Sequence, residues 1–164
     1  MKLLVANRGE IAIRILRGAA DLGIDTVGIA SADDTSSPHL RAANEVAMLP
    51  GEGPRAYLDI DSIIDAARRT ECTALHPGYG FLAESPALAR SCIDTGILFV
   101  GPRPDTLDTL GDKAQSRDLA EKLGIPILPG ATTLGEAEAL LGTLGEAGAL
   151  MVKAVAGGGG RGLR

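Results

Sequence analysis

Residues 150–164 contain the residue types that bind a polyphosphate. Lys153 interrupts an apolar run, and four consecutive glycines at 157–160 follow it, with Arg161 next to them. Glycines leave backbone N–H groups open to an anion, and the two cations add attraction for phosphate. Lysine and arginine beside the glycine run predict a nucleotide-phosphate site. Lys113 is a further isolated cation earlier in the chain, and taken alone it is more often an exposed lysine in the first turn of a helix. An edge-facing lysine followed by a flexible glycine run is the alternative that the residues leave open.

A second candidate site is the segment 76–84, which reads His-Pro-Gly-Tyr-Gly-Phe-Leu-Ala-Glu. Tyr79 stands between two glycines, and this position favours a ring that faces a ligand. Phe81 is expected to fill the core. A single histidine in such a turn is more often hydrogen-bonded than metal-bound, so His76 is not expected to bind a metal.

Charged residues also gather on one face of an expected helix over residues 10–22. Arg14, Arg17 and Asp21 recur at helical spacing, whereas Ile11, Ile15, Gly18, Ala19 and Leu22 would form the apolar face. The charged face is either simply solvated or a contact with a partner subunit.

The elements that position these residues alternate between strand and helix. Short apolar runs predict strands at 3–6, 26–30, 45–49, 73–75 and 97–100. Helices are expected at 10–22, 61–69, 86–95, 104–110, 113–123 and 134–147, and a further strand at 150–155. This order predicts a doubly wound, mostly parallel α/β sheet over about residues 1–103. The loops at Asn7, His76 and Gly101 would then lie at the carboxyl ends of strands, where such sheets bind ligands.

Composition narrows the function classes. The formal net charge of −5 and an aromatic content of 2% argue against nucleic-acid binding and against a membrane surface. No apolar run at the N-terminus is long enough for a signal peptide or a membrane span. Cys72 and Cys92 lie 20 positions apart without a C-x-x-C pair, so two reduced, buried thiols in a cytoplasmic protein are expected.

Taken together, the motifs resemble those of the biotin carboxylase family. The matching segments are Ala6-Asn7-Arg8-Gly9-Glu10-Ile11-Ala12, His76 to Glu84, Gly101-Pro102, Gly111-Asp112-Lys113, and Val152-Lys153-Ala154 with Gly157 to Arg161. They occur in order and at matching spacing, and the resemblance covers essentially the whole chain. It implies a pre-ATP-grasp α/β domain over residues 1–110. A linker and the truncated start of an ATP-grasp domain, ending in the glycine-rich loop, would then occupy 111–164.

The resemblance also implies an activity and its partners. The family uses MgATP to phosphorylate bicarbonate to carboxyphosphate, and then carboxylates the ureido nitrogen of biotin on a carrier domain. Lys113, Lys153, Gly159 and Gly160 would bind ATP. Tyr79 and Gly80 would form the edge of the biotin pocket, and Arg14, Arg17 and Asp21 would lie in a homodimer contact. A biotin carboxyl carrier domain and a carboxyltransferase would be the partners.

The magnesium ligands and the catalytic residues of the family lie downstream of the part that this sequence matches. No catalytic residue is therefore expected within these 164 residues, and the chain alone is expected to be inactive. Two alternatives remain open at this point. One is another ATP-grasp ligase of the carbamoyl-phosphate or purine-pathway type, and the other is a non-catalytic dimerisation module. The final acyl-CoA or keto-acid acceptor is not encoded in these residues.

Overall fold

The structure is a computed structural model that describes residues 1–145 and 148–152 of the chain. It divides into two compact units, with the boundary between Leu107 and Asp108.

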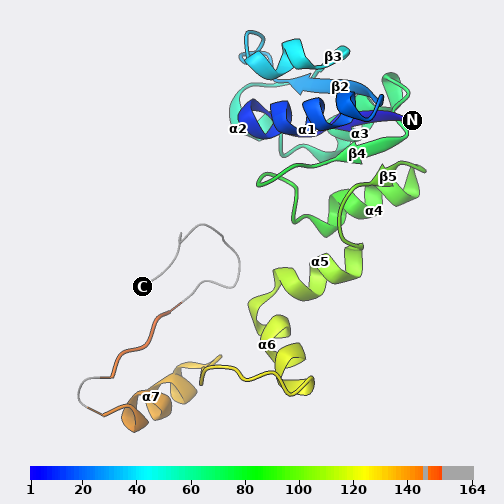
Figure 1. Ribbon diagram of the computed structural model, residues 1–164. Coiled ribbons are helices and arrows are strands. Elements are labelled where there is room, and N and C mark those ends of the chain that lie inside the picture. Colours follow the sequence, from blue (N-terminus) through cyan, green and yellow to red (C-terminus); the bar gives the residue numbers. More distant parts are fainter. Residues whose placement is uncertain (146–147, 153–164) are drawn as a thin grey trace. The chain divides into compact units, whose positions relative to one another are not determined.

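The first unit is built on a sheet of five parallel strands (Figure 1). The strands are β1 (Lys2–Val5), β2 (Asp25–Ala30), β3 (Glu45–Met48), β4 (Ala74–His76) and β5 (Leu98–Phe99). Their order across the sheet is β3-β2-β1-β4-β5. Leu4 in the centre of the sheet pairs with Val27 on one side and with Leu75 on the other. The predicted doubly wound, parallel α/β fold is confirmed.

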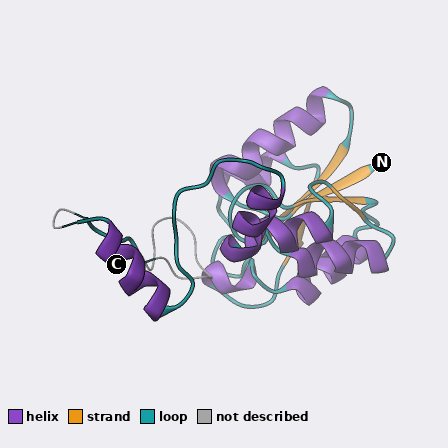
Figure 2. Ribbon diagram, turned by 90° about the horizontal axis from the view of Figure 1, so that it is seen from below, coloured by secondary structure: helices purple, strands orange, loops and turns teal. Residues whose placement is uncertain are grey.

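Both faces of this sheet are covered by helices (Figure 2), which explains the unbroken apolar runs of its inner strands, such as Leu3-Leu4-Val5 in β1. Successive strand residues point to opposite faces. Leu3 and Val5 therefore pack with α1 (Gly9–Asp21), whereas Leu4 packs on the side of α3 (Ile60–Arg69) and α4 (Pro86–Asp94).

The buried stripe of α1 differs from the expected one. Leu22 is 77% exposed because it lies at the C-cap, beyond the last helical turn. Ile11 and Ile15 are only partly buried. The residues that face the sheet are Ala12, Leu16 and Ala19. Two of these three are alanines, whose small side chains let the helix backbone lie close to the strands.

Helix starts in the first unit follow the sequence signals. Asp59 caps α3 by accepting a hydrogen bond from the Ser62 backbone N–H, and Ser85 caps α4 by accepting from that of Leu88. Two short elements were not predicted, the 3-10 helix η1 (Pro38–Ala42) and α2 (Gly53–Ala56). Each spans about one turn, which is too short for a periodic apolar pattern.

The second unit consists of helices over its described residues. Helix α5 (Pro104–Gly111) runs across the boundary between the units, and α6 (Lys113–Lys122) and α7 (Leu134–Thr143) follow. Thr133 and Glu136 form the predicted capping box of α7. This helix ends at Thr143, before the predicted residue 147. Residues 150–152 form no strand, and the remainder of the strand predicted at 150–155 lies outside the described residues.

Cys72 and Cys92 are free and buried, as predicted. Burial raises the pKa of both thiols, that of Cys92 to about 11. Among the described residues, no helix has the length and apolar character needed to cross a membrane.

Candidate functional site at the carboxyl edge of the sheet

The strand order places a topological switch point between β1 and β4. From β1 the chain moves outward through β2 and β3, and then returns to the other side of β1 as β4 and β5. The loops that follow β1 and β4 therefore diverge from adjacent strands at the carboxyl edge of the sheet, where this class of fold binds ligands. They carry the Asn7-Arg8 pair and the segment 76–84, both of which the sequence singled out.

Asn7 connects these two loops directly. Its side chain is buried, and its Nδ2 donates hydrogen bonds to the carbonyl oxygens of Pro77 at 2.8 Å and Tyr79 at 2.9 Å. Its Oδ1 accepts from the Arg8 backbone N–H at 2.9 Å. Both donors and the acceptor of the amide are thus used, and the loop after β4 is fixed to the end of β1.

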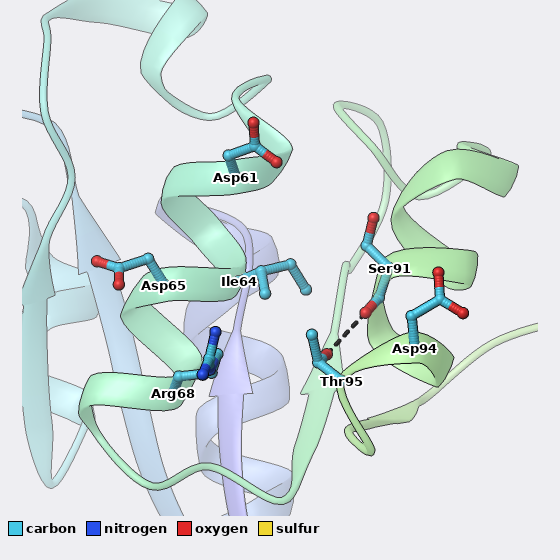
Figure 3. Close-up of a pocket in the computed structure, with 7 residues that line it drawn as sticks. All are labelled: Asp61, Ile64, Asp65, Arg68, Ser91, Asp94 and Thr95. Carbon is cyan, nitrogen blue, oxygen red and sulfur yellow. Dashed lines mark hydrogen bonds between the residues drawn. The ribbon is translucent and has the colours of Figure 1, made fainter.

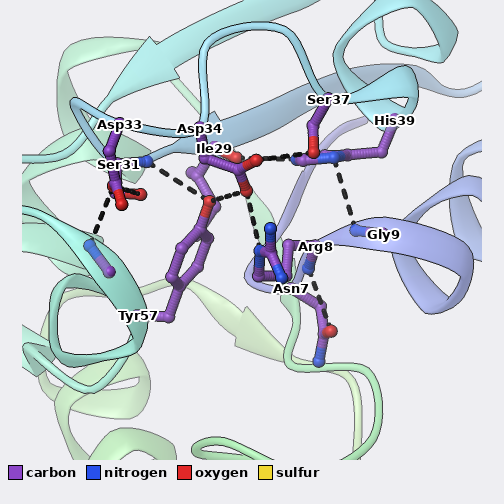
Figure 4. A network of polar contacts seen from close by, with 11 residues as sticks. Asn7, Arg8, Gly9, Ile29, Ser31, Asp33, Asp34, Ser37, His39 and Tyr57 are labelled. Atoms are coloured by element: carbon purple, nitrogen blue, oxygen red, sulfur yellow. Dashed lines mark hydrogen bonds and ion pairs between the residues drawn. The ribbon is translucent and has the colours of Figure 1, made fainter.

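Arg8 continues from this point into a network with Asp34 and Tyr57 (Figure 4). The Arg8 Nε donates to Asp34 Oδ2 at 2.7 Å, and the Tyr57 hydroxyl donates to the same oxygen at 2.9 Å. The other oxygen of Asp34 accepts from the Ser37 hydroxyl at 2.6 Å. The Arg8 guanidinium also lies 5.9 Å from the centre of the Tyr57 ring. The network joins the ends of β1 and β2 to helix α2.

The charges in this network fix its protonation state. The hydrogen bond from Arg8 holds the pKa of the Asp34 carboxyl well below its usual range, and the hydroxyls of Ser37 and Tyr57 lower it further. The same hydrogen bond raises the pKa of Arg8. Burial raises the pKa of the Tyr57 phenol. At neutral pH, therefore, Asp34 is an anion, Arg8 is a cation and Tyr57 keeps its proton.

A neighbouring carboxylate, Asp33, binds the start of α2. It accepts hydrogen bonds from the Gly53 backbone N–H at 2.8 Å and from the Ser31 hydroxyl at 2.7 Å. These two donors lower the pKa of Asp33. A cavity of about 150 Å³ lies among these groups, lined by Arg8, Ser31, Asp33, Asp34, Gly53, Pro54 and Tyr57. Arg8 and Asp34 bind each other, and Asp33 binds Ser31 and Gly53, so the arrangement holds loops together.

The two histidines are hydrogen-bonded within the first unit. His39 is fully buried; its Nδ1 accepts from the Gly9 backbone N–H at 3.3 Å, and its Nε2 lies 3.0 Å from the Ile29 carbonyl oxygen. Nε2 therefore carries the proton. His76 Nδ1 accepts from the Gly78 backbone N–H at 3.0 Å, and burial lowers the pKa of this imidazole. The prediction of a hydrogen-bonded His76 is confirmed.

The loop after β4 has an unusual backbone. Gly78, Gly80 and Phe81 have φ angles of 71°, 70° and 43°, so three of four consecutive residues are left-handed. Phe81 is 38% exposed, and its ring lies against Tyr57 with a centroid distance of 5.4 Å. The Tyr79 side chain is 78% exposed. The loop thus anchors one ring and leaves the other available to a ligand.

The remaining predicted site residues belong to other segments of the chain. Arg14, Arg17 and Asp21 are exposed along α1. Lys113 is the first residue of α6 in the second unit and is exposed. The predicted ATP-binding residues Lys153, Gly159 and Gly160 lie outside the described residues. Among the described residues, Tyr79 and Gly80 are the predicted site residues on this loop, whereas Arg14, Arg17 and Asp21 share one face of α1.

A larger groove lies between α3 and α4 (Figure 3). Its volume is about 290 Å³, and its lining residues are Asp61, Ile64, Asp65, Arg68, Ser91, Asp94 and Thr95. None of the predicted site residues lines it. No group of three His, Cys, Asp or Glu residues that could hold a metal ion occurs within 1–145 and 148–152.

Sequence reasoning missed Asp33, Asp34, Tyr57 and His39. Asp33 and Asp34 lie in a polar loop after β2. Their place directly after a strand was the one sequence signal that could have identified them. The fold and the loops after β1 and β4 together define the class of domain. It is a doubly wound α/β domain whose candidate binding loops diverge at the switch point of the sheet.

Comparison with known proteins identifies the family within this class. The model of the biotin carboxylase N-terminal domain matches residues 1–107. Pyruvate carboxylase of Bacillus subtilis is 49% identical over 168 residues, which cover 99% of this chain and 14% of that protein. The chloroplastic biotin carboxylase of Arabidopsis thaliana is 44% identical over 167 residues, which cover 99% of this chain and 31% of that protein.

Solved structures indicate the same family. The biotin carboxylase domain of Hydrogenobacter thermophilus 2-oxoglutarate carboxylase, a dimer in complex with MgADP, ADP and bicarbonate, matches with a TM-score of 0.92 and 40% identity over 99% of this chain and 36% of that one. The biotin carboxylase domain of a single-chain bacterial carboxylase matches with a TM-score of 0.84 and 47% identity, covering 89% of this chain and 35% of that one. The chain belongs to the biotin carboxylase family, and it spans between about a seventh and about a third of these relatives.

Proposed function

We propose that this chain is the N-terminal portion of an ATP-dependent biotin carboxylase, a carbon–nitrogen ligase. The observation that carries the proposal is the match over 99% of the chain to a carboxylase domain in complex with MgADP and bicarbonate. The structure supports it, because the segment 76–84 lies at the switch-point edge of the sheet, where a ligand is expected.

In the proposed reaction, an oxygen of bicarbonate attacks the γ-phosphorus of ATP and ADP leaves, which gives carboxyphosphate. The bond between the carboxyl carbon and the bridging oxygen then breaks, which releases carbon dioxide and phosphate. The carbon dioxide forms a bond with the ureido nitrogen of biotin, and the phosphate accepts the proton that this nitrogen loses. Phosphoryl transfer of this kind depends on positioning and on cations that stabilise the charge of the phosphates. Magnesium would supply further positive charge at the phosphates, and we assign its ligands to the part of the enzyme beyond this chain.

Four residues of this chain would bind ATP: Lys113, Lys153, Gly159 and Gly160. Lys113 is exposed in the first turn of α6. Asp112 caps that helix, and its hydrogen bonds to the backbone N–H groups of Gln115 and Ala114 lower its pKa and orient the carboxylate toward the helix. Gly159 and Gly160 would close over the phosphates and exclude water from carboxyphosphate.

The experiment joins residues 1–164 in register to the remainder of biotin carboxylase 2 of Bacillus subtilis, a relative that is 44% identical over 167 residues. The joined enzyme is expected to hydrolyse ATP in the presence of bicarbonate, and free biotin is expected to stimulate it. Lys113→Gln should raise the KM for ATP and leave the KM for biotin unchanged. A joined enzyme that folds and binds ATP, but whose rate is independent of biotin, would refute the proposal.

We also propose that residues 1–164 alone do not turn over, because the groups that complete the phosphoryl-transfer site are supplied by the rest of the enzyme. The partners of the complete enzyme would be a biotin carboxyl carrier domain and a carboxyltransferase. Two free, buried thiols fit a reducing compartment such as the cytoplasm.

The exposed face of α1 is our proposed homodimer contact. Arg14, Arg17 and Asp21 lie on this face, and the related Hydrogenobacter thermophilus domain was solved as a dimer. Changing both arginines to glutamate in the joined enzyme should convert a dimer to a monomer in size-exclusion chromatography. An unchanged elution volume would exclude this face from the contact.

A further inference from the structure

The segment 77–81 is attached to the body of the first unit at two points. At its start, Asn7 donates to the carbonyl oxygens of Pro77 and Tyr79. At its end, the ring of Phe81 lies against that of Tyr57. Tyr79 and Gly80 stand between the two attachments, and both are exposed.

The backbone conformation of this segment depends on contacts with the rest of the first unit. Phe81 has a left-handed φ of 43°, which is unfavourable for a residue with a side chain. Its hydrogen bonds with adjoining residues are local: the Gly78 N–H donates to His76 Nδ1, and the Ala83 N–H donates to the Gly80 carbonyl oxygen. A conformation of this kind persists only where the surroundings determine it.

The two anchors are themselves immobilised. Asn7 is buried at the end of β1, and its Oδ1 is fixed by the Arg8 N–H. Tyr57 is 1% exposed, and its hydroxyl is fixed between Asp34 and the Ser31 N–H. Each anchor therefore transmits the geometry of the sheet edge to the exposed loop.

We propose that Asn7 and Tyr57 are positioning residues, which hold the segment 77–81 so that Tyr79 and Gly80 face the biotin ring in a fixed orientation. The claim about biotin rests on the proposed function, whereas the claim that these two side chains hold the loop does not. Neither residue touches the substrate; each acts through the loop.

The first test is made on this chain by amide hydrogen exchange at Gly78 and Ala83. Asn7→Asp keeps the shape and the acceptor but removes both donors, and Asn7→Ala removes the side chain. Both should accelerate exchange at these two amides about tenfold or more, because each lost hydrogen bond changes the opening equilibrium by up to about tenfold. The matched control is Asn44→Ala: Asn44 accepts from Thr26 at the opposite end of the sheet, at 2.9 Å.

Tyr57 provides a second, conservative comparison. Tyr57→Phe retains the ring against Phe81 but loses the hydroxyl, so it should lower global stability without accelerating exchange at Ala83. Tyr57→Leu, which also removes the ring, should accelerate exchange there about tenfold or more. Equal exchange in the two variants would overturn the assignment of Tyr57, and exchange in the Asn7 variants no faster than in Asn44→Ala would overturn that of Asn7.

The second test measures kinetics in the joined enzyme. Asn7→Asp and Tyr57→Leu should raise the KM for free biotin at least about fivefold, while the KM for ATP and the biotin-independent, bicarbonate-dependent ATPase stay near those of Asn44→Ala. Faster amide exchange with an unchanged KM for biotin would refute the claim that these residues position the loop for biotin, and would leave the proposed function intact. Absence of any biotin effect in the unsubstituted joined enzyme would instead refute the proposed function, and with it the biotin part of this inference.

Discussion

Gly78 combines a left-handed backbone with close neighbours, so the addition of a single methyl group there should have a large effect. Its φ of 71° disfavours a side chain. A Cβ placed there would lie 2.6 Å from Asn7 Nδ2 and 2.9 Å from Ile11 Cγ2. Asn7 cannot move aside without breaking its hydrogen bonds to Pro77 and Tyr79. Gly78→Ala should therefore combine strain, overpacking and lost hydrogen bonds.

The expected cost is the sum of these three contributions. A left-handed alanine costs about 1 kcal/mol relative to glycine. Overpacking of a closed site costs about 1–3 kcal/mol, and displacing Asn7 loses about 1 kcal/mol for each of its hydrogen bonds. Gly78→Ala should thus lower the free energy of unfolding by about 4–6 kcal/mol, which is a large part of the stability of an ordinary domain.

Gly80→Ala is the matched control, since Gly80 has a φ of 70° but no atom within 4 Å of an added Cβ. Only the strain of about 1 kcal/mol should appear there. The assay is urea unfolding followed by the fluorescence of the buried Tyr57, in a Tyr79→Phe background that removes the exposed tyrosine. The two alanine variants should differ by about 3–5 kcal/mol, the overpacking and hydrogen-bond contributions together.

Equal losses at Gly78 and Gly80 would refute the reasoning, because the backbone strain alone would then explain both. A double-mutant cycle identifies the colliding side chain. In an Asn7→Ala background, Gly78→Ala should cost less than in the original chain, and the contact with Ile11 should account for what remains. Additive losses would exclude Asn7 as the obstacle.

Three further predictions concern acid stability and helix capping. The folded state depresses the pKa of Asp34, so this carboxylate stabilises the fold above its unfolded pKa of about 3.9. That stabilisation is lost as the pH falls through the folded pKa. In urea unfolding, Asp34→Asn should therefore reduce the dependence of stability on pH in this acid range. Burial lowers the pKa of His76, so the unfolded state binds its proton first, and stability should fall as pH drops below about 6.5 in the original chain but not in His76→Gln. Ser85→Ala removes the acceptor for the Leu88 N–H and should cost about 1 kcal/mol, which Ser85→Asp should largely restore; equal stability of the two variants would contradict the capping role.

The alternation of strands and helices along the chain could be anticipated from the sequence because its signals are local. Apolar runs such as 26–30 must be buried on both faces, and capping residues such as Ser85 define helix starts over three or four residues. The loop at 76–84 stood out for the same reason, since its unusual composition lies within one segment.

The contacts that hold this loop could not be anticipated, because they join residues distant in sequence. Asn7 reaches carbonyl oxygens 70 and 72 positions away, and Arg8 pairs with Asp34 across 26 positions. A backbone carbonyl carries no residue-type signal, and a carboxylate in a polar loop resembles any solvated one. The buried stripe of α1 was misjudged because alanines such as Ala12 give a weaker apolar signal than Ile11, although their small size suits close packing.

The central claim, that this chain forms the first part of a biotin carboxylase, is tested most directly by product formation. ATP-dependent transfer of ¹⁴C from labelled bicarbonate to free biotin would be measured for residues 1–164 alone and for the same residues joined to the remainder of biotin carboxylase 2 of Bacillus subtilis. We predict no labelled biotin with the chain alone and clear, ATP-dependent labelling with the joined enzyme. Labelling by the chain alone, or a folded joined enzyme that binds ATP and never labels biotin, would contradict the account.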